Sequence, residues 1–337
     1  MLQKYFKELL QRNKILSIVA IEITNTCNMR CVHCYQEDRK KKYTSNYLPL
    51  EVIKNIVDQL VELKTLRVSL TGGEVFCHPN IIEIIDYIHS KNISVSLLSN
   101  ITLVTHELLS KMVGKVHAIY TTIYGFDEET YESITRVKGS YWRYMEAKNL
   151  IKNSNIYLEE RSVLLNQNSH QLDDMFESCT NIGVKIDVNP HNKYAQKCIS
   201  NEACRRRYFT HMDIKRHTSD VDVCDILENK VCNICEDSLC ITYAGDVIPC
   251  INLNYILGNV YNDKLSDIWD SPKIKQIREL TKIKYFKKCL NCPDIKYNKF
   301  WCLATNFYET GDMHTPSEYS CNMCKDIKAV SENDIVE

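Results

Sequence analysis

The sequence has almost no net charge and no long apolar run. Its 42 Lys and Arg residues balance 43 Asp and Glu residues, giving a formal net charge of -1 over 337 residues. Because nucleic-acid binding depends on a net positive surface, we expect no nucleic-acid partner. The longest nearly apolar stretch, Ile15–Ile21, includes Ser17 and is far shorter than the ~20 residues of a membrane helix. We therefore expect no membrane-spanning segment.

A secretory signal is also missing. Residues 1–14 lack an apolar core and a small-residue cleavage site, and they indicate a short amphipathic helix instead. The sequence contains no internal repeat and no low-complexity tract. These absences favour a cytoplasmic protein, and its length predicts two or three domains.

Cysteine, in contrast, is abundant, with 17 residues. A large chain without a secretory signal is expected in a reducing compartment, where metal or cluster ligation explains cysteines better than a disulfide framework. Their placement supports ligation, because three crowd one short segment and ten fall between Cys224 and Cys324. The other four are interpreted as plain buried thiols: Cys77, Cys179, Cys198 and Cys204.

Short β-branched runs alternate with longer helical segments from residue 16 to about residue 188. This alternation is typical of a parallel sheet built from βα units, and six units imply a curved, incomplete relative of the eight-unit barrel. Strands are expected at Leu16–Ile23, Leu66–Leu70, Ile93–Leu98, Val116–Thr121, Tyr157–Leu165 and Val184–Val188. Helices are expected at Leu50–Leu63, Asn80–Lys91, Thr105–Val113, Tyr141–Ser154 and Gln171–Ile182.

The predicted fold is α/β: a partial (β/α)6 TIM-like barrel with a cysteine-rich, cluster-binding C-terminal domain. We expect the barrel over residues 1–190, an irregular bridging segment over residues 191–231 and the cluster domain over residues 232–337. The one charge run of the bridge, Arg205-Arg206-Arg207, is interpreted as a solvated face rather than as a contact with an acidic peptide. In the cluster domain we expect a turn at Leu265–Trp269 and a helix at Ile274–Lys282.

Unusual residues follow the first four predicted strands, at the rim where barrels of this kind carry their chemistry. The three-cysteine segment follows the first strand. The next three strands are followed by Thr71-Gly72-Gly73-Glu74, by Ser99-Asn100 and by Thr122-Ile123-Tyr124-Gly125. The gathering of four motifs at one rim predicts the active site there.

The segment Cys27-x3-Cys31-x2-Cys34 places three thiolates within eight residues. A [4Fe–4S] cluster has one ligand per iron, so three cysteines leave one iron open for substrate-level chemistry. Zinc is the alternative, with His33 as a further ligand. It favours two CxxC pairs, however, and His33 lies awkwardly between two ligands. The spacing favours a cluster with an open iron.

At these residues the sequence resembles the radical S-adenosylmethionine (radical SAM) enzymes, and the loop order extends the resemblance over residues 16–190. The resemblance implies that Cys27, Cys31 and Cys34 bind a [4Fe–4S] cluster whose open iron binds S-adenosylmethionine. One electron from the reduced cluster then yields a 5′-deoxyadenosyl radical, which abstracts hydrogen from an unactivated carbon. The resemblance also implies that His33 lies near the adenine.

The glycine-rich segment matches the family as well. Gly72, Gly73 and Glu74 correspond to a Gly-Gly-Glu stretch in which the glycines permit close backbone approach and the acid receives the methionine ammonium group. Val75 stands where the family commonly has proline, which changes loop stiffness more than chemistry.

Three more cofactor contacts are implied. Asn100 lies in a turn whose family glycine is Ile101 here, so we expect a less free backbone. Thr122 would reach the ribose, and Arg136 would pair with the methionine carboxylate through its planar guanidinium group. Each has a structural alternative: a turn residue for Asn100, a strand residue for Thr122 and a surface cation for Arg136.

Paired cysteines recur in the C-terminal region. The eight candidate ligands are Cys232, Cys235, Cys250, Cys289, Cys292, Cys302, Cys321 and Cys324. Eight thiolates suffice for two fully ligated [4Fe–4S] clusters, although zinc ribbons also use CxxC pairs. The order, including Gly245-x4-Cys250, resembles the SPASM domain, the auxiliary-cluster extension of radical SAM enzymes. Two cysteines, Cys224 and Cys240, remain unassigned.

This resemblance implies two auxiliary clusters and three [4Fe–4S] clusters in all. The first auxiliary cluster would use Cys232, Cys235, Cys250 and Cys302, and the second Cys289, Cys292, Cys321 and Cys324. Asn298 occupies the usual place of one ligand of the second cluster, and Cys324 is the expected replacement. Without Cys324, the second cluster would have an open iron.

SPASM enzymes resembling this chain mostly modify ribosomally made peptides or proteins, by crosslinks, thioethers, epimerisation and similar changes. We therefore expect a peptide or protein substrate and a one-electron donor such as flavodoxin or ferredoxin. Only 26 residues precede Cys27, too few for an N-terminal leader-binding domain, so a separate leader-peptide-binding protein is a candidate partner.

Two alternatives stay open. One is a radical SAM dehydrogenase or epimerase for a small molecule, and the other is a non-catalytic iron–sulfur or zinc scaffold. The scaffold explains the cysteines but not the Gly-Gly-Glu segment at the same rim. No catalytic acid or base is assigned, although the rim candidates are Tyr35, Tyr124, Asp187 and His191.

Overall fold

The computed structural model describes residues 15–34, 46–182, 185–187, 202–211, 226–298 and 301–333. Its strands are β1 (Ile18–Thr24), β2 (Arg67–Gly72), β3 (Ser94–Leu98), β4 (Val116–Thr122), β5 (Tyr157–Val163), β6 (Lys185–Asp187), β7 (Ser238–Ile241), β8 (Asp246–Ile248) and β9 (Gly258–Asn259). Several expected features lie outside the described residues or side chains: the N-terminal helix, Tyr35, Cys179, Asp187, His191, Cys198, Cys204 and Cys224.

Helices surround this sheet. Those of the barrel are α3 (Leu50–Glu62), α4 (Ile81–Ser90), α5 (His106–Met112), α6 (Glu128–Thr135), α7 (Ser140–Lys152) and α8 (Leu172–Ile182). Later ones are α10 (Glu202–His211), α12 (Leu265–Trp269), α13 (Pro272–Leu280), α14 (Lys287–Leu290), α15 (Leu303–Thr310) and α16 (Glu318–Asn333). Short 3-10 turns are η1 (Val75–Cys77), η2 (Asn166–Gln171), η4 (Ile283–Tyr285) and η5 (Ile295–Tyr297).

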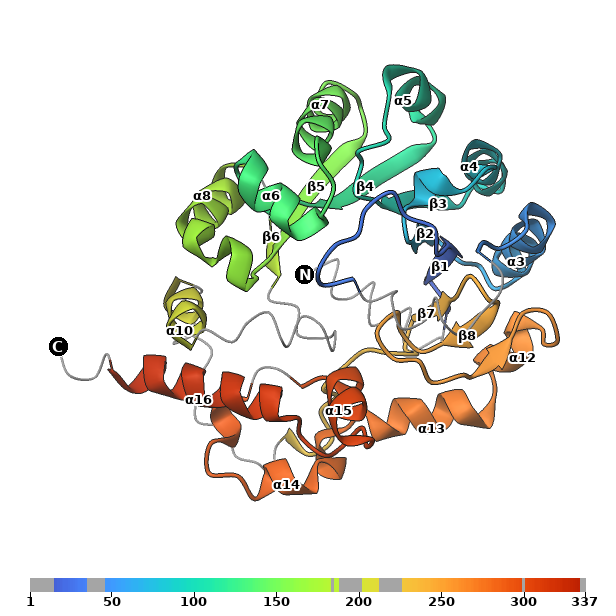
Figure 1. Ribbon diagram of the computed structural model, residues 1–337. Coiled ribbons are helices and arrows are strands. Elements are labelled where there is room, and N and C mark those ends of the chain that lie inside the picture. The colour runs from blue at the N-terminus through green and yellow to red at the C-terminus, as the bar shows by residue number, and fades with distance from the viewer. Residues whose placement is uncertain are drawn as a thin grey trace.

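The nine strands form one sheet in the order β6-β5-β4-β3-β2-β1-β7-β8-β9. Strands β1 to β6 are parallel throughout, and the sheet curves with α3, α4, α5, α7 and α8 along its outer side (Figure 1). The six predicted strands and the five predicted helices of this half are confirmed, with ends within two residues of those expected. The partial barrel is therefore confirmed as the fold.

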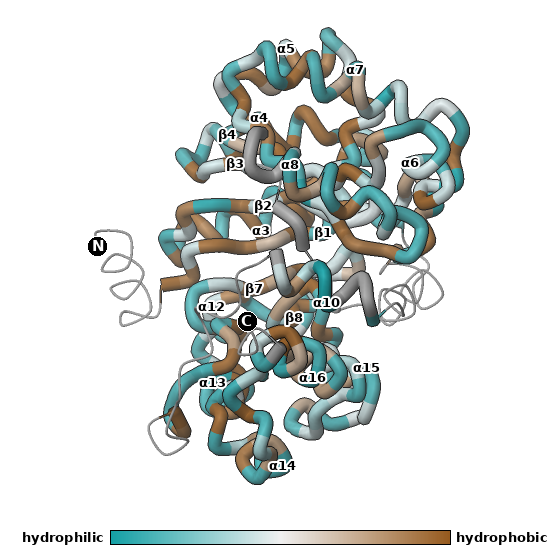
Figure 2. Tube along the Cα trace, turned by 90° about the vertical axis from the view of Figure 1, so that its left-hand side faces the viewer, coloured by the Kyte–Doolittle hydropathy of each residue, from teal (hydrophilic) through white to brown (hydrophobic). Residues whose placement is uncertain are grey.

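Amphipathic patterning explains the outer layer. The buried residues of α3 are Ile53, Ile56, Val57 and Leu60, which lie on one helical face. Along β1, Val19, Ile21 and Ile23 are fully buried at alternate positions, so one face of the strand packs against the helices. Figure 2 shows hydrophobic stretches along the barrel strands, whereas the outer helices alternate between hydrophobic and hydrophilic positions.

The C-terminal region contributes to the barrel sheet, which the sequence did not indicate. Strand β7 pairs in parallel with β1, from Ile18 opposite Ser238 to Ile21 opposite Ile241, and β8 and β9 continue as antiparallel strands. The buried Cys240 lies on β7 as a strand residue, as expected of a cysteine left out of the ligand sets. The cysteine-rich region is thereby joined to the first strand of the barrel.

Helix α6 was not predicted. It follows β4, begins at an N-cap where Asp127 accepts a hydrogen bond from the Thr130 N–H, and ends at Arg136 in the left-handed conformation. Its sequence signal is weak, because Tyr131 and Ile134 are the only large apolar residues among its eight. Two helices, α6 and α7, therefore lie between β4 and β5 instead of one.

The expectation of irregular structure is wrong for residues 202–211, which form α10. The sequence signal is weak because the apolar Tyr208 and Phe209 are adjacent rather than spaced by a helical turn. Both are buried against α16. Arg206 and Arg207 of the arginine run are exposed as expected, yet Arg206 forms ion pairs with Glu202 and Asp326, and Arg207 forms one with Asp173.

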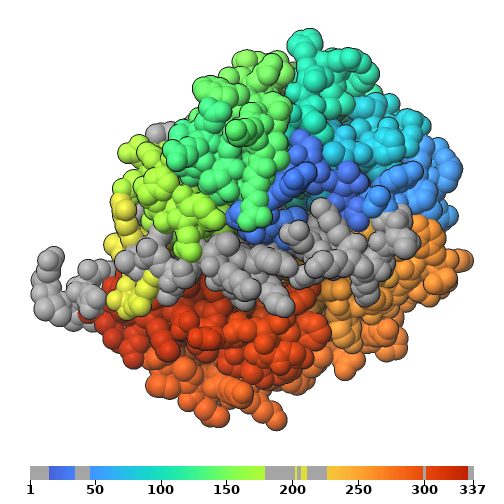
Figure 3. Space-filling view, viewed as in Figure 1, coloured from blue at the N-terminus to red at the C-terminus, as the bar shows by residue number. Residues whose placement is uncertain are grey.

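Beyond residue 232, more regular structure is present than expected. Helices α12 and α13 match the predicted turn and helix, and α12 buries Leu265, Ile268 and Trp269. Helices α15 and α16 were not predicted, because α16 is mostly polar and α15 has only eight residues. The barrel and the C-terminal elements occupy opposite halves of one face of the molecule (Figure 3).

In the part of the chain that the structure describes, no helix has the length and apolarity needed to cross a membrane.

Candidate functional site

The first cysteine loop, residues 25–34, leaves the carboxyl end of β1 and runs toward α6 (Figure 1). Two backbone hydrogen bonds of 3.0 Å fix it there, from Arg30 N–H to the Thr135 carbonyl and from Val32 N–H to the Ile134 carbonyl. The C-terminal turn of α6 therefore sets the path of the loop.

This loop gathers three half-buried thiols, those of Cys27, Cys31 and Cys34. They lie close enough for the charge of one to affect another. Burial, with a further contribution from the neighbouring thiolates, raises the pKa of Cys31 to about 12 and that of Cys27 to about 11. Three thiolates here need compensating positive charge, and the irons of a cluster would supply it.

A fourth thiol lies beside the loop. Cys77, the last residue of η1, is within electrostatic range of Cys27 and accepts a hydrogen bond from the Asn28 N–H. It was interpreted from the sequence as a plain buried thiol, and it is half-buried. Only the tertiary fold brings it near Cys27, since 50 positions separate the two residues in the chain.

The two glycines of the Gly-Gly-Glu segment permit close packing against the same loop. A Cβ atom at Gly72 would lie 2.1 Å from the Thr24 carbonyl oxygen, and one at Gly73 would lie 2.3 Å from the Thr26 carbonyl oxygen. The backbone amides of Gly73 and Glu74 donate to these two carbonyls at 2.7 and 2.8 Å. The close backbone approach expected of the glycines is present, and it is an approach to the start of the cysteine loop.

Glu74 is completely buried and joins two rim loops. One carboxylate oxygen accepts from the Ser99 hydroxyl at 2.7 Å and from the Phe76 N–H at 3.2 Å. The other accepts from the Asn100 N–H at 2.7 Å. Burial, opposed by these hydrogen bonds, raises the pKa of Glu74 to about 7. Its predicted contact with a ligand ammonium group stays a prediction.

The turn at Asn100 lies directly at the first thiol. The Asn100 side-chain amide donates to the Asn28 side-chain oxygen at 2.9 Å and approaches the Cys27 sulfur at 3.8 Å. Ile101, at the family's glycine position, nevertheless adopts the left-handed conformation with φ 57° and is fully buried. The backbone therefore takes the glycine-like conformation despite a β-branched side chain, which we had expected to restrict it.

His33 and Tyr124 pack together beside the loop, with ring centroids 4.9 Å apart. Burial lowers the pKa of His33 to about 4. The Tyr124 hydroxyl is in hydrogen-bond contact with the Cys31 sulfur. The sequence marked Tyr124 as a rim residue without a role, and no motif indicated this contact.

Thr122 and Arg136 both lie at this rim. Thr122 is half-buried at the end of β4, opposite Arg161 of β5 in the sheet register. Arg136 is exposed at the end of α6, one residue beyond the Thr135 carbonyl that holds the cysteine loop. Their proposed contacts with ribose and carboxylate stay predictions.

The first C-terminal thiol set is Cys232, Cys235, Cys250 and Cys302. Charge interactions link Cys232 with Cys302, Cys235 with Cys250, and Cys250 with Cys232 and Cys302. Burial raises the pKa of Cys235 and that of Cys250 to about 12. The thiols come from the segment before β7, the end of β8 and the N-terminus of α15, so folding brings together four separate positions.

The second C-terminal set is Cys289, Cys292, Cys321 and Cys324. The Cys324 charge interacts with those of all three other members, and Cys289 and Cys321 also interact with each other. Cys289 is on α14, whereas Cys321 and Cys324 are on α16, with the Cys324 thiol donating to the Asp294 carbonyl at 3.1 Å. Cys324 thus lies with the set that it was expected to complete.

Within the described residues, no three His, Cys, Asp or Glu side chains converge as they would on a single metal ion. Charge interactions nevertheless link the thiols within each of the three sets. Each set consists of thiols alone, and cysteine thiolates are the ligands of [4Fe–4S] clusters, so the donor sets fit clusters.

The structure is that of a partial barrel with one thiol set at the rim of its curved parallel sheet and two further sets in the C-terminal region, and these donor sets fit iron–sulfur clusters. The chain contains a radical SAM domain: residues 21–179 match the model of that superfamily. Residues 232–293 match SPASM, an iron–sulfur cluster-binding domain. The resemblance drawn from Cys27, Cys31, Cys34 and the C-terminal cysteines is confirmed.

Known proteins are similar over most of the chain. The antilisterial bacteriocin subtilosin biosynthesis protein AlbA of Bacillus subtilis is 26% identical, over 81% of this chain and 64% of AlbA. An AdoMet-dependent heme synthase of Nitratidesulfovibrio vulgaris is 23% identical, over 90% of this chain and 92% of its own. The crystal structure of Streptococcus suis SuiB bound to precursor peptide SuiA has a TM-score of 0.67 at 17% identity, covering 93% of this chain and 78% of SuiB.

Proposed function

We propose that this enzyme oxidatively modifies a ribosomally made peptide or protein, using S-adenosylmethionine and three [4Fe–4S] clusters. The observation that carries the proposal is the meeting of three elements at one rim. These are the three-thiol loop, the buried Glu74 and the Asn100 turn, all joined by hydrogen bonds. A scaffold protein would need the thiols but not this Gly-Gly-Glu contact.

In this proposal Cys27, Cys31 and Cys34 hold the cluster that binds the cofactor. When bound, cluster and S-adenosylmethionine supply a one-electron cleavage that yields a 5′-deoxyadenosyl radical able to abstract hydrogen from the substrate. Gly73 keeps the glycine-rich loop against the cysteine loop, and Glu74 holds the Asn100 turn beside Cys27. His33, Thr122 and Arg136 are proposed to contact adenine, ribose and carboxylate.

The C-terminal thiols are proposed to hold electron acceptors. After hydrogen abstraction, a substrate radical must lose one electron and then either release a proton or form a bond to a nucleophile that releases one, to become a closed-shell product. The set of Cys232, Cys235, Cys250 and Cys302 and the set of Cys289, Cys292, Cys321 and Cys324 would each hold a cluster that takes this electron. A flavodoxin or ferredoxin is proposed as the donor for the first cluster.

Two relatives support a peptide or protein as the class of substrate. AlbA is named for bacteriocin biosynthesis, and SuiB was solved with a precursor peptide. The alignment spans 64% of AlbA, so the activity of the whole AlbA protein is not assigned to this chain. A separate protein that binds a leader peptide is a further proposed partner.

A second candidate is oxidation of a small molecule. It is favoured by the similarity to the heme synthase, which covers 90% of this chain, more than the alignment with AlbA. Both candidates share the radical step and differ only in the substrate. The experiment must therefore test the radical step first and the substrate second.

The radical step is tested on anaerobically purified, reduced protein supplied with S-adenosylmethionine. We expect release of 5′-deoxyadenosine from the parent and from Cys240→Ala, whose thiol is buried on β7 outside the three sets. Cys31→Ala should release only the background amount. Equal release by Cys31→Ala would refute the proposed ligand role of the loop.

The substrate is tested with short peptides encoded beside this chain, followed by mass spectrometry. A peptide substrate should lose hydrogen atoms only when S-adenosylmethionine and reductant are both present. Cys321→Ala should still release 5′-deoxyadenosine but form no product, because the acceptor would be impaired. Normal product formation by Cys321→Ala would exclude an electron-accepting role for the second set. Failure of every peptide, with 5′-deoxyadenosine still released, would favour the small-molecule candidate.

A further inference from the structure

Arg278 of α13 is anchored against one cysteine of the first C-terminal set. Its Nε donates to the Cys235 carbonyl oxygen at 2.5 Å. The guanidinium carbon lies 4.5 Å from the ring centroid of Trp269, on α12. A hydrogen bond on one side and an aromatic face beside it fix the plane of the guanidinium group.

One nitrogen of this group has no acceptor in the part of the chain that the structure describes. The Arg278 Nη2 atom is buried and makes no hydrogen bond there. The positive charge lies close enough to the Cys235 thiol for each group to affect the other electrostatically. A buried N–H of a charged group without an acceptor costs free energy, so an acceptor outside the described residues is expected at this place.

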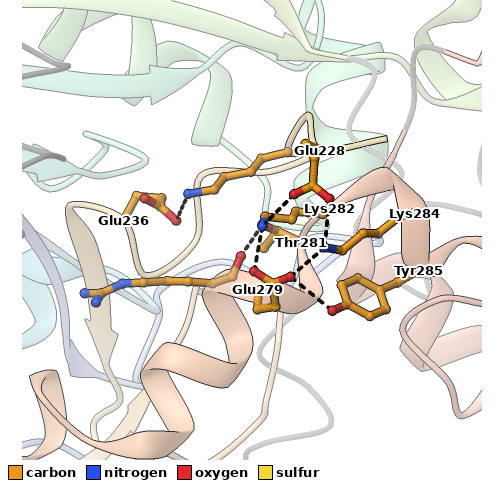
Figure 4. A network of polar contacts seen from close by, with 9 residues as sticks. Glu228, Glu236, Glu279, Thr281, Lys282, Lys284 and Tyr285 are labelled. Atoms are coloured by element: carbon orange, nitrogen blue, oxygen red, sulfur yellow. Dashed lines mark hydrogen bonds and ion pairs between the residues drawn. The ribbon is translucent and has the colours of Figure 1, made fainter. Parts of the chain in front are cut away.

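The other charged groups near Cys235 do not supply the positive charge that Arg278 supplies. Glu236 is buried, and its carboxylate pairs with Lys230 Nζ at 2.5 Å (Figure 4). Glu236 and, more weakly, Asp270 also attract the Arg278 charge. Cys235 itself has φ 59°, a left-handed conformation that is uncommon outside glycine. The bond from Arg278 to its carbonyl therefore helps to hold a strained cysteine in place.

We propose that Arg278 donates a charge-assisted hydrogen bond through Nη2 to a sulfur atom of the cluster held by Cys232, Cys235, Cys250 and Cys302, and so raises its reduction potential. The inference rests on the proposed cluster at this set. Reduction of a [4Fe–4S] cluster adds one negative charge, which a neighbouring cation stabilises. Arg278 is thus a positioning residue that makes this cluster a better electron acceptor.

The test is an EPR-monitored titration with dithionite of full-length protein carrying Arg278→Gln, Arg278→Lys or Lys284→Gln. Lys284 is a matched control, since it is a cation of the same region whose ion pairs are with Glu228 and Glu279 (Figure 4). Arg278→Gln should make reduction of the cluster at least tenfold less favourable, a potential drop of about 59 mV or more for one electron. Arg278→Lys should shift it less in the same direction, and Lys284→Gln should not.

A background with Cys31→Ala and Cys292→Ala isolates the signal by removing a ligand from each of the other sets. If that background does not load iron, the titration is made on the otherwise intact chain, where one of the cluster potentials should move. Unchanged potentials in both Arg278 variants, with the cluster loaded, would overturn the inference and leave the proposed function standing. Absence of any cluster at this set would instead refute the proposed function.

A second measurement does not depend on the potential. Protein labelled with nitrogen isotope in its arginines should show, in pulsed EPR of the reduced cluster, a hyperfine coupling to a guanidinium nitrogen. Arg278→Lys should lose that coupling. A coupling that persists in Arg278→Lys would assign the contact to another arginine and overturn the inference.

Discussion

At the scale of residues, the close packing of the two loops at the rim requires a residue without a Cβ atom at position 73. A Cβ at Gly73 would lie 2.3 Å from the carbonyl oxygen and 2.7 Å from the carbonyl carbon of Thr26, immediately before Cys27. Both are backbone atoms, so the cysteine loop would have to move. The φ of Gly73 is not in the left-handed region, so glycine is required at this position only because there is no room for a Cβ atom.

Gly73→Ala should therefore lower the iron bound by the first set and abolish 5′-deoxyadenosine release. Gly114→Ala is the control. It has φ 82° but nothing within 4 Å of an added Cβ, so it adds backbone strain of about 1 kcal/mol far from the loop. Iron analysis and a cleavage assay on both variants check this. Full iron and normal cleavage in Gly73→Ala would mean that the packing does not matter.

Glu74 is the second residue on which the rim depends. Its two oxygens accept from the Phe76 and Asn100 backbone amides, which can only donate. In Glu74→Gln one of these amides would face an NH2 group, so we expect about 1–3 kcal/mol lower unfolding free energy and weaker S-adenosylmethionine binding. Denaturant unfolding and equilibrium binding measure the two effects, with the exposed Glu83→Gln as control. Equal behaviour of the two variants would contradict this account of Glu74.

The motif residues could be identified from the sequence, because spacing and residue type are local properties. Their neighbours could not. Cys77 and Tyr124 reach the thiols only through the tertiary fold. The conformation of Ile101 was misjudged for a related reason. Its amide donates to the Ser99 hydroxyl at 2.8 Å and its side chain is fully buried, and these contacts outweigh the local preference of a β-branched residue.

At the scale of elements, α10 and α16 form a unit that carries two ligands of the second C-terminal set. Phe209 of α10 is fully buried in the same apolar cluster as Met323, Cys324 and Ile327 of α16. An ion pair from Arg206 to Asp326, with Nε and Oδ1 3.6 Å apart, adds a contact between the two helices. The position of Cys324 therefore depends on α10.

Phe209→Ala should destabilise this unit by about 3–5 kcal/mol, the usual cost of removing a buried phenylalanine side chain. We expect loss of about four irons per chain, those of one [4Fe–4S] cluster, while 5′-deoxyadenosine release is retained. Thr210→Ala, at the exposed next position, should keep all the iron. Iron analysis of both variants tests this prediction. Full iron in Phe209→Ala would show that α10 does not support the second set.

The barrel elements could be predicted because their buried residues repeat with strand or helix periodicity, as in α3 and β1. Helices α10 and α16 were not predicted, because their sequences are polar and they are stabilised by packing on each other. Strand β7 has four residues, too few for a periodic signal, and its partner β1 lies more than 200 positions earlier. Long-range pairing of this kind is not encoded locally.

At the scale of the whole molecule, one continuous sheet connects the two cysteine-rich regions. Strand β1 leads into the first cysteine loop at its carboxyl end and pairs over Ile18–Ile21 with β7, which follows Cys232 and Cys235. The first proposed acceptor set, which includes Cys232 and Cys235, is thus built onto the same sheet as the proposed radical site. The second set lies on α14 and α16, outside the sheet.

The central claim is that the cluster held by Cys27, Cys31 and Cys34 keeps one iron free for S-adenosylmethionine. The most direct measurement is EPR of the reduced full-length protein with Cys250→Ala and Cys292→Ala, so that this cluster alone is complete, before and after addition of S-adenosylmethionine carrying an isotope-labelled amino group. The account predicts that the spectrum shifts and that the label couples magnetically to the cluster. A spectrum that does not change on addition, or a fourth protein ligand on that iron, would contradict it.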